Sequence, residues 1–151
     1  MTEPAHKSFI VRPAAHVPLN VVGEQISVLA RGDTTGSYEV FIQGGPEGAG
    51  PPPHMHGWDE SYYVLAGELE VMVNGQVQIL GPGEFIHIPG ESVHNFRLRK
   101  SGTKFLSINS RAGAAAFFEE LHHKVSGPDD VPTLLAVANR HQVRVPPPPA
   151  P

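Results

Sequence analysis

Two histidines and a glutamate stand close together in the segment GPPPHMHGWDESYYVLAGELEV, which covers residues 50–71. His54 and His56 are two residues apart, and in an extended chain such residues point to the same face. Glu60 has the same parity and begins the next strand-like run. Imidazole nitrogens combined with a carboxylate oxygen suit divalent first-row metals. The spacing therefore predicts a site for one divalent transition metal, which would be Fe, Mn, Ni, Cu, Co or Zn.

The composition limits how such a metal could be held. The chain has 151 residues, nine histidines and no cysteine, which excludes disulfides, thiolate zinc sites and thiol nucleophiles. The pattern His-x-His-x-x-x-Glu would arise by chance in such a chain with a probability of roughly 4 per cent. By itself it is a modest signal, and histidines that are simply satisfied by hydrogen bonds are the alternative.

The glycines around these residues make the pattern more specific. Gly48, His54, His56, Glu60 and Gly67 have the spacing of the first signature of the cupin superfamily, which this segment resembles. Further along, Gly83, Pro89 and His94 resemble the second signature. There are two departures, Glu91 where a glycine is usual and Leu98 where an asparagine is usual. They concern a local turn and a strand contact, and neither is at a ligand position.

The resemblance covers residues 23–109 and carries implications for fold and site. It implies an all-β protein, a single cupin jelly-roll β-barrel built as a closed double-sheet sandwich, with two short C-terminal helices appended. It also implies that His54, His56, Glu60 and His94 are the metal ligands. A vestigial pocket that binds no metal is the alternative.

The opening PPPHMHGWDESYYVLAGE is similar to that of quercetinase-like small cupins. This similarity implies a metal-dependent dioxygenase acting on a small aromatic or enolisable substrate. Glu60 would be catalytic there, either completing the metal shell or taking the proton of a substrate hydroxyl. Two alternatives remain, a non-redox isomerase or polyketide-type cyclase, and a cupin that binds a small ligand without turnover.

Short β-like runs separated by Gly, Pro and Asn supply the elements that must position these residues. The hairpin ELEVMVNGQVQIL is the clearest, because Leu69, Val71 and Val73 alternate with polar positions and Asn74-Gly75 favour a type I′ turn. Strand parity from Glu60 and His94 predicts inward-facing side chains, Ala66 among them. The substrate pocket is then expected to comprise Tyr62, Val64, Met72, Phe96, Leu98 and Ile108. Tyr63, Leu65 and either Ile86 or Ile88 are expected to face outward.

The character of the chain changes after Ser110. AGAAAFFEELHHKV predicts an amphipathic helix, and DDVPTLLAVANRHQV predicts a second, with Pro132 in its first turn. We expect both to dock on the β-domain, with Phe117 and Phe118 as docking surface or as a lid. The expected organisation is an N-terminal arm at 1–22, the cupin barrel at 23–110, a helical segment at 111–143 and an extended Pro-rich tail at 144–151.

The charge of the chain limits its partners. A net charge of −4 offers no basic surface for a phosphate backbone, so nucleic acid is not expected. Neither a leader-like segment nor a long apolar run is evident, so we expect a cytoplasmic protein without membrane contact. The expected partners are a small-molecule substrate and, because dimers are common among cupins, a second copy of the chain. His87 is expected to be a surface residue or a hydrogen-bond partner of a ligand histidine.

Overall fold

The computed structural model describes residues 6–147. Its strands are β1 (Leu19–Val21), β2 (Glu24–Ala30), β3 (Glu39–Gly44), β4 (Glu60–Ala66), β5 (Leu69–Val73), β6 (Gln76–Leu80), β7 (Phe85–Ile88), β8 (His94–Leu98) and β9 (Lys104–Asn109). Its helices are the 3₁₀ turn η1 (Pro13–Ala15), α1 (Gly32–Thr35), α2 (Ala114–Lys124) and α3 (Val131–Arg140).

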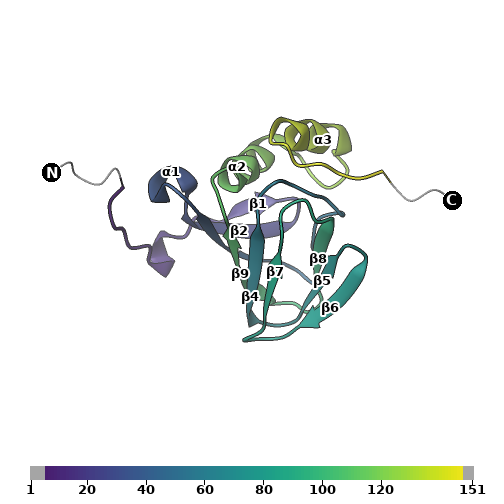
Figure 1. Ribbon diagram of the computed structural model, residues 1–151, viewed down its shortest axis with the longest axis horizontal. Coiled ribbons are helices and arrows are strands. Elements are labelled where there is room, and N and C mark those ends of the chain that lie inside the picture. Colours follow the sequence, from purple (N-terminus) through teal and green to yellow (C-terminus); the bar gives the residue numbers. More distant parts are fainter. Residues whose placement is uncertain (1–5, 148–151) are drawn as a thin grey trace.

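Two antiparallel sheets form a sandwich (Figure 1). One sheet has the strand order β1-β2-β3-β9-β4-β7, and the other has the order β6-β5-β8. The predicted double-sheet jelly roll with two C-terminal helices is confirmed. The expectation of a closed barrel is not, because within residues 6–147 the sheets remain separate and β1, β7, β6 and β8 are edge strands.

The β5–β6 hairpin follows the sequence pattern. Leu69 and Val71 are buried, and the strands pair from Leu69↔Leu80 to Val73↔Gln76. Asn74 and Gly75 form the turn with φ values of 48° and 84°, the left-handed region that a type I′ turn requires at both positions. Glu91 also has a positive φ, 68°, which explains why a glycine is usual there.

The two C-terminal helices lie together over one end of the sandwich (Figure 1). A buried carboxylate fixes the start of α2, since Glu39 accepts hydrogen bonds from the backbone N–H groups of Gly113, Ala115 and Gly32 at 3.1, 3.0 and 2.9 Å. A negative charge at this end also complements the helix dipole. A network around Glu120 joins α2 to Arg140 and His141 near the end of α3.

The orientations predicted from strand parity were wrong for Ala66 and for the pair Ile86 and Ile88. Ala66 is exposed, because a register shift between Val64 and Ala66 breaks the alternation of β4 against β9. Ile88 is buried and Ile86 packs against the same core, so neither faces outward. Directly paired residues of antiparallel strands share a face, and these two pair with the inward-facing Glu60 and Tyr62.

The ends of the domain differ from the expected boundaries. β1 lies within the segment expected to be an arm, and it pairs with β2 as the edge of the larger sheet. Arg144, at the start of the expected tail, forms an isolated bridge with Met55. Residues 1–5 of the arm and 148–151 of the tail lie outside the described residues. Among residues 6–147, none of the helices has the length and apolar character needed to cross a membrane.

Two apolar clusters form the interior. One fills the space between the sheets and includes Tyr62, Val64, Leu69, Phe96 and Phe105. The other lies under α2 and α3 and consists of Val21, Ile26, Phe41, Trp58, Ala114, Ala115, Leu121, Val137, Ala138 and Val143. Residues of both clusters line one cavity, so the cavity lies where the two clusters meet.

Candidate metal centre

The segment that carries His54 and His56 is held along both of its edges. The backbone of His54 exchanges two hydrogen bonds with that of His94 on β8, at 3.0 and 2.9 Å. The backbone of Met55, between the two histidines, exchanges two with Arg144, at 2.8 and 2.9 Å. Residues far apart in the chain therefore fix the position of the His-x-His segment.

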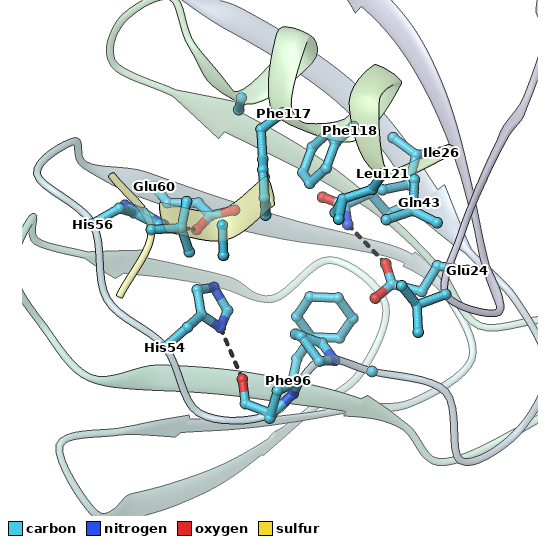
Figure 2. A pocket seen from close by; sticks show the side chains of 18 of the residues that line it. Glu24, Ile26, Gln43, His54, His56, Glu60, Phe96, Phe117, Phe118 and Leu121 are labelled. Carbon is cyan, nitrogen blue, oxygen red and sulfur yellow. Dashed lines mark hydrogen bonds and ion pairs between the residues drawn. The ribbon is translucent and has the colours of Figure 1, made fainter. Parts of the chain in front are cut away.

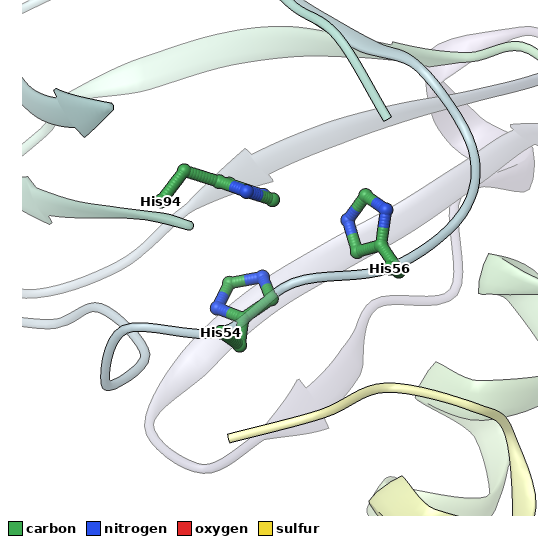
Figure 3. A group of neighbouring side chains, drawn as sticks. All are labelled: His54, His56 and His94. Carbon is green, nitrogen blue, oxygen red and sulfur yellow. The ribbon is translucent and has the colours of Figure 1, made fainter. Parts of the chain in front are cut away.

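Three imidazole rings are turned toward a common space (Figure 3). One nitrogen from each of His54, His56 and His94 lies within 4.8 Å of the others. The Nδ1 atoms of these rings lie 2.9, 3.0 and 2.9 Å from the backbone carbonyl oxygens of Pro52, Trp58 and Ser92. A carbonyl oxygen only accepts, so each Nδ1 carries the proton and each Nε2 keeps its lone pair. This is the tautomer in which a histidine binds a metal through Nε2.

Glu60, the first residue of β4, completes the donor set. Its Oε2 lies 3.2 Å from Nε2 of His56 and 3.1 Å from Nε2 of His94, and its Oε1 accepts a hydrogen bond from the Ser107 hydroxyl at 3.2 Å. Lone pairs of two imidazoles and a carboxylate face one another at these contacts, which requires a proton or a metal cation between them. The residues present therefore fit a divalent cation.

Burial and mutual charge perturb the same groups. Burial lowers the pKa of His54 to about 4, with the neighbouring His94 adding to the effect, which favours the neutral ring that a metal needs. Burial acts to raise the pKa of Glu60, but its contacts with His56 and His94 outweigh this effect, and the net pKa is well below the usual range. The pKa of His94 is raised, because its contact with Glu60 outweighs its burial.

A hydrogen-bonded chain behind the centre holds Glu60 and was missed in the sequence. The Trp58 indole donates to Oδ1 of Asn109 at 2.8 Å, and Asn109 donates to the Ser107 hydroxyl at 3.1 Å, which reaches Glu60. The Trp58 ring also stacks on His56, with centroids 4.0 Å apart. The spacing of these residues could have revealed them. Trp58 lies two residues from both His56 and Glu60, and Ser107 and Asn109 are two residues apart on β9, so each set can point to one face.

An apolar cavity of about 120 Å³ opens beside the centre (Figure 2). A site for one water needs roughly 10–15 Å³, so the cavity has room for a small ligand. His54, His56 and Glu60 line it, as do Tyr62 and Phe96 of the expected pocket residues. Burial, reinforced by the negative charges of Glu60 and Glu24, holds the pKa of the Tyr62 hydroxyl well above its usual value.

Four other expected pocket residues lie elsewhere. Val64 and Leu98 are fully buried between the sheets, below the cavity lining. Met72 is on the face of β5 opposite to the inward Val71, and Ile108 follows the buried Ser107 on β9 and faces outward. His87 is also on the outer surface, where its Nδ1 lies 3.0 Å from the Ser61 hydroxyl and does not contact the ligand histidines.

The roof and the far wall of the cavity come from elements outside the two signatures. Phe117, Phe118 and Leu121 of α2 and Leu134 and Ala138 of α3 line it from above. Phe118 also packs edge-on against Phe41, with ring centroids 5.1 Å apart, so the predicted docking surface is also the pocket roof. Glu24 and Gln43 line the far wall, and no feature of the sequence pointed to them as pocket residues.

Comparisons with known proteins concern the family and the fold. Residues 41–109 match the family model described as "Cupin domain". A quercetin 2,3-dioxygenase of Bacillus subtilis (strain 168) is 31% identical over 110 residues, which are 71% of this chain and 33% of that protein. The chain therefore spans about a third of the length of this curated relative.

Two solved structures illustrate the shared fold. KdgF from Halomonas sp. matches with a TM-score of 0.62 at 24% identity, covering 69% of this chain and 93% of its own. The polyketide cyclase RemF from Streptomyces resistomycificus matches with a TM-score of 0.60 at 22% identity, covering 69% and 80%. At these sequence identities the two matches show a shared fold and nothing about function.

Proposed function

The chain belongs to the cupin superfamily, and on that premise we propose that it is a metal-dependent dioxygenase acting on a small aromatic or enolisable compound. The similarity to a quercetin 2,3-dioxygenase supports this proposal, as does a candidate metal centre beside an apolar cavity. The observation that carries it is the orientation of His54, His56 and His94, whose Nδ1 protons are committed to backbone carbonyls so that their Nε2 atoms are free to bind a cation.

In this proposal, His54, His56, His94 and Glu60 hold one divalent transition metal, with Fe, Mn, Ni, Cu, Co and Zn all compatible with the donor set. A bound metal of this kind supplies Lewis acidity and, for the redox-active members of the series, electron transfer. The burial of three of the four donors, His56, Glu60 and His94, favours tight binding, because water competes poorly for the site.

The protein's own residues have three tasks. Oε2 of Glu60 either completes the metal shell or accepts the proton of a substrate hydroxyl, while the Ser107 hydroxyl donates a hydrogen bond to its other oxygen. Phe96, Phe117 and Phe118 exclude water and provide flat walls for an aromatic ring. The chain from Trp58 through Asn109 to Ser107 keeps the Glu60 carboxylate in position.

Oxygen uptake with flavonols and other enolisable aromatics tests the proposal. We expect the metal-loaded protein to consume dioxygen in proportion to substrate, and the variant Glu60→Gln to lose at least about a hundredfold in rate, a typical contribution of acid–base catalysis. The matched control is His87→Ala, which removes a surface histidine outside the cavity and should leave the rate unchanged. Absence of oxygen uptake with every substrate would contradict the dioxygenase.

A non-redox isomerase or cyclase is the second candidate. The observation that favours it is the buried carboxyl of Glu24 on the wall across from Glu60, since two carboxyl groups in different protonation states could move a proton without a redox step. Turnover that continues unchanged without dioxygen would select this candidate. Ligand that binds and is recovered intact would instead select a binding protein.

We also propose that the protein forms a homodimer through the outer face of the larger sheet. Tyr63, Leu65, Phe85 and Ile108 are exposed on this face to 40%, 43%, 58% and 36%. Tyr63 pairs with Phe85 on the adjacent strand, so the apolar side chains adjoin one another. Light scattering coupled to size exclusion measures the mass, and a monomer at micromolar concentration would contradict the proposal.

A further inference from the structure

Two polar side chains are buried in the otherwise apolar far wall of the cavity. Glu24 begins β2 and Gln43 lies on β3, where it pairs with Ile26, two residues along from Glu24 on the same face. The Gln43 Nε2 group donates a hydrogen bond to Oε2 of Glu24 at 3.1 Å. Their exposed fractions are 6% and 2%. The cavity therefore has a second polar end, formed by residues that are not in the candidate metal centre.

One hydrogen-bond acceptor of this pair has no partner among the described residues. Oε1 of Gln43 is buried and has no hydrogen-bond partner within residues 6–147. A buried acceptor left unpaired is destabilising, and such groups in native proteins usually meet a ligand or an ordered water. Because Gln43 lines the cavity, a molecule within the cavity can supply the missing donor. Ile26, Phe118 and Leu121 surround the pair with apolar surface (Figure 2).

We propose that Gln43 and Glu24 form a binding subsite for a hydroxyl group of the substrate, which donates to Oε1 of Gln43 and accepts from the carboxyl group of Glu24. One acceptor beside one donor matches a phenolic hydroxyl, which both donates and accepts. The subsite would select flat compounds that carry a ring hydroxyl remote from the reacting end.

The protonation of Glu24 agrees with this role. Burial raises the pKa of Glu24 to about 8, with the hydrogen bond from Gln43 opposing the rise and the charge of Glu60 adding to it. At neutral pH the carboxyl group therefore retains its proton. Oε2 already accepts from Gln43, so Oε1 is left to carry the proton and to donate it toward a ligand.

The location of the pair defines a ligand bound at two points. Figure 2 shows Glu24 and Gln43 on one side of the cavity and His54, His56 and Glu60 on the other, with the Phe96 ring close to the space between them. A substrate whose reacting oxygens face the histidines would extend its far ring toward Gln43. The inference rests on the proposed function in assuming that the substrate occupies this cavity.

Ligand binding can be measured without turnover, so the experiment tests the subsite independently of the proposed dioxygenase reaction. The single tryptophan of the chain, Trp58, lines the cavity, and its fluorescence reports on occupancy. The metal-loaded protein is titrated without dioxygen with 3-hydroxyflavone, which has no hydroxyl on its outer rings, and with quercetin, which has them on both. The variants are Gln43→Leu, which keeps the side-chain volume approximately, and Glu24→Gln, which keeps a donor and an acceptor. The matched control is Gln25→Leu, the same substitution on the exposed face of β2.

We expect the wild-type protein and Gln25→Leu to bind quercetin at least about tenfold more tightly than 3-hydroxyflavone, the ratio expected for hydroxyl groups met by buried partners. Gln43→Leu should bring the two affinities together by weakening quercetin binding, and Glu24→Gln should keep most of the preference. Circular dichroism establishes that each variant is folded. Equal affinities in the wild-type protein, failure of both flavonols to bind, or a preference that survives in Gln43→Leu would overturn the subsite.

Discussion

The buried carboxyl of Glu24 makes the stability of the protein depend on pH. The informative perturbation is Glu24→Gln, which keeps the shape and the hydrogen bond with Gln43 but cannot ionise. In the unfolded chain a glutamate titrates near 4.5, whereas burial raises the pKa of Glu24 in the folded protein to about 8. Between these values the folded protein retains a proton that the unfolded chain has released, so the free energy of unfolding falls as pH rises.

The size of the effect follows from the two pKa values. Each pH unit between them corresponds to about 1.4 kcal/mol, so wild-type stability should fall by about 2 kcal/mol from pH 4.5 to pH 6 and by about 5 kcal/mol once pH exceeds 8. Glu24→Gln cannot ionise, so its free energy of unfolding lacks this dependence on pH. The free energy of unfolding of the variant minus that of the wild type should therefore increase by several kcal/mol from pH 5 to pH 9.

Urea unfolding at pH 5, 6, 7, 8 and 9 measures this difference. Glu60 and Tyr62, whose charges interact with that of Glu24, are present in both proteins, and each keeps one protonation state from pH 5 to pH 9, because the pKa of Glu60 lies well below this range and that of Tyr62 well above it. Metal content must be equal in the two samples, because metal binding itself depends on pH. The matched control is Glu47→Gln, which changes an exposed glutamate in the loop after β3.

Parallel curves for Glu24→Gln and wild type from pH 5 to pH 9 would refute the reasoning. They would mean that the native protein ionises Glu24 as easily as the unfolded chain does, and hence that the far wall of the cavity is wetter than its apolar lining indicates. A rising difference in the Glu47→Gln control would attribute the effect to overall charge rather than to the buried site.

Three further outcomes are expected. Glu39→Ala removes the acceptor of three backbone N–H groups, two at the start of α2 and one at the start of α1. It should lower the free energy of unfolding in urea by about 2–4 kcal/mol and speed hydrogen exchange in α2. Unchanged exchange in α2 would contradict the anchoring role. Trp58→Phe keeps the stacking but removes the indole donor to Asn109, so it should cost about 1–3 kcal/mol in urea unfolding, and a neutral effect would mean that the chain behind Glu60 does not hold it. Gly50→Ala would place a β-carbon against a backbone carbonyl oxygen of β8 and should yield little folded protein, whereas Gly127→Ala, with open space around it, should fold normally; comparable soluble yields would contradict the close packing.

Much of the fold could be predicted because its signals are local. Alternation and turn residues located the strand that begins at Glu60 and the β5–β6 hairpin, whose register Asn74-Gly75 fixed. β1 was missed because a strand of three residues has too few positions to show an alternation. Ala66 was misplaced because a register shift depends on the neighbouring strand β9, which parity within one strand cannot reveal.

The candidate site was predictable only in part, for a related reason. His54, His56 and Glu60 stand in one short segment whose residue types favour a metal, and the resemblance to the two cupin signatures added His94. The cavity walls depend on tertiary packing, which brings β2, β3, α2 and α3 over the centre. Nothing in the local sequence distinguishes Glu24, and only its burial against Gln43 makes it chemically unusual.

Elemental analysis of the purified protein tests the central claim most directly. If His54, His56, Glu60 and His94 form a metal centre, the wild-type protein should contain one equivalent of a divalent transition metal per chain, and His56→Ala should lose most of it, since a buried Nε2 donor is removed. His87→Ala, a histidine substitution on the outer surface, should keep the wild-type content. Full occupancy in His56→Ala, or a wild-type protein that takes up no metal when supplied with the whole series from Mn to Zn, would contradict the account.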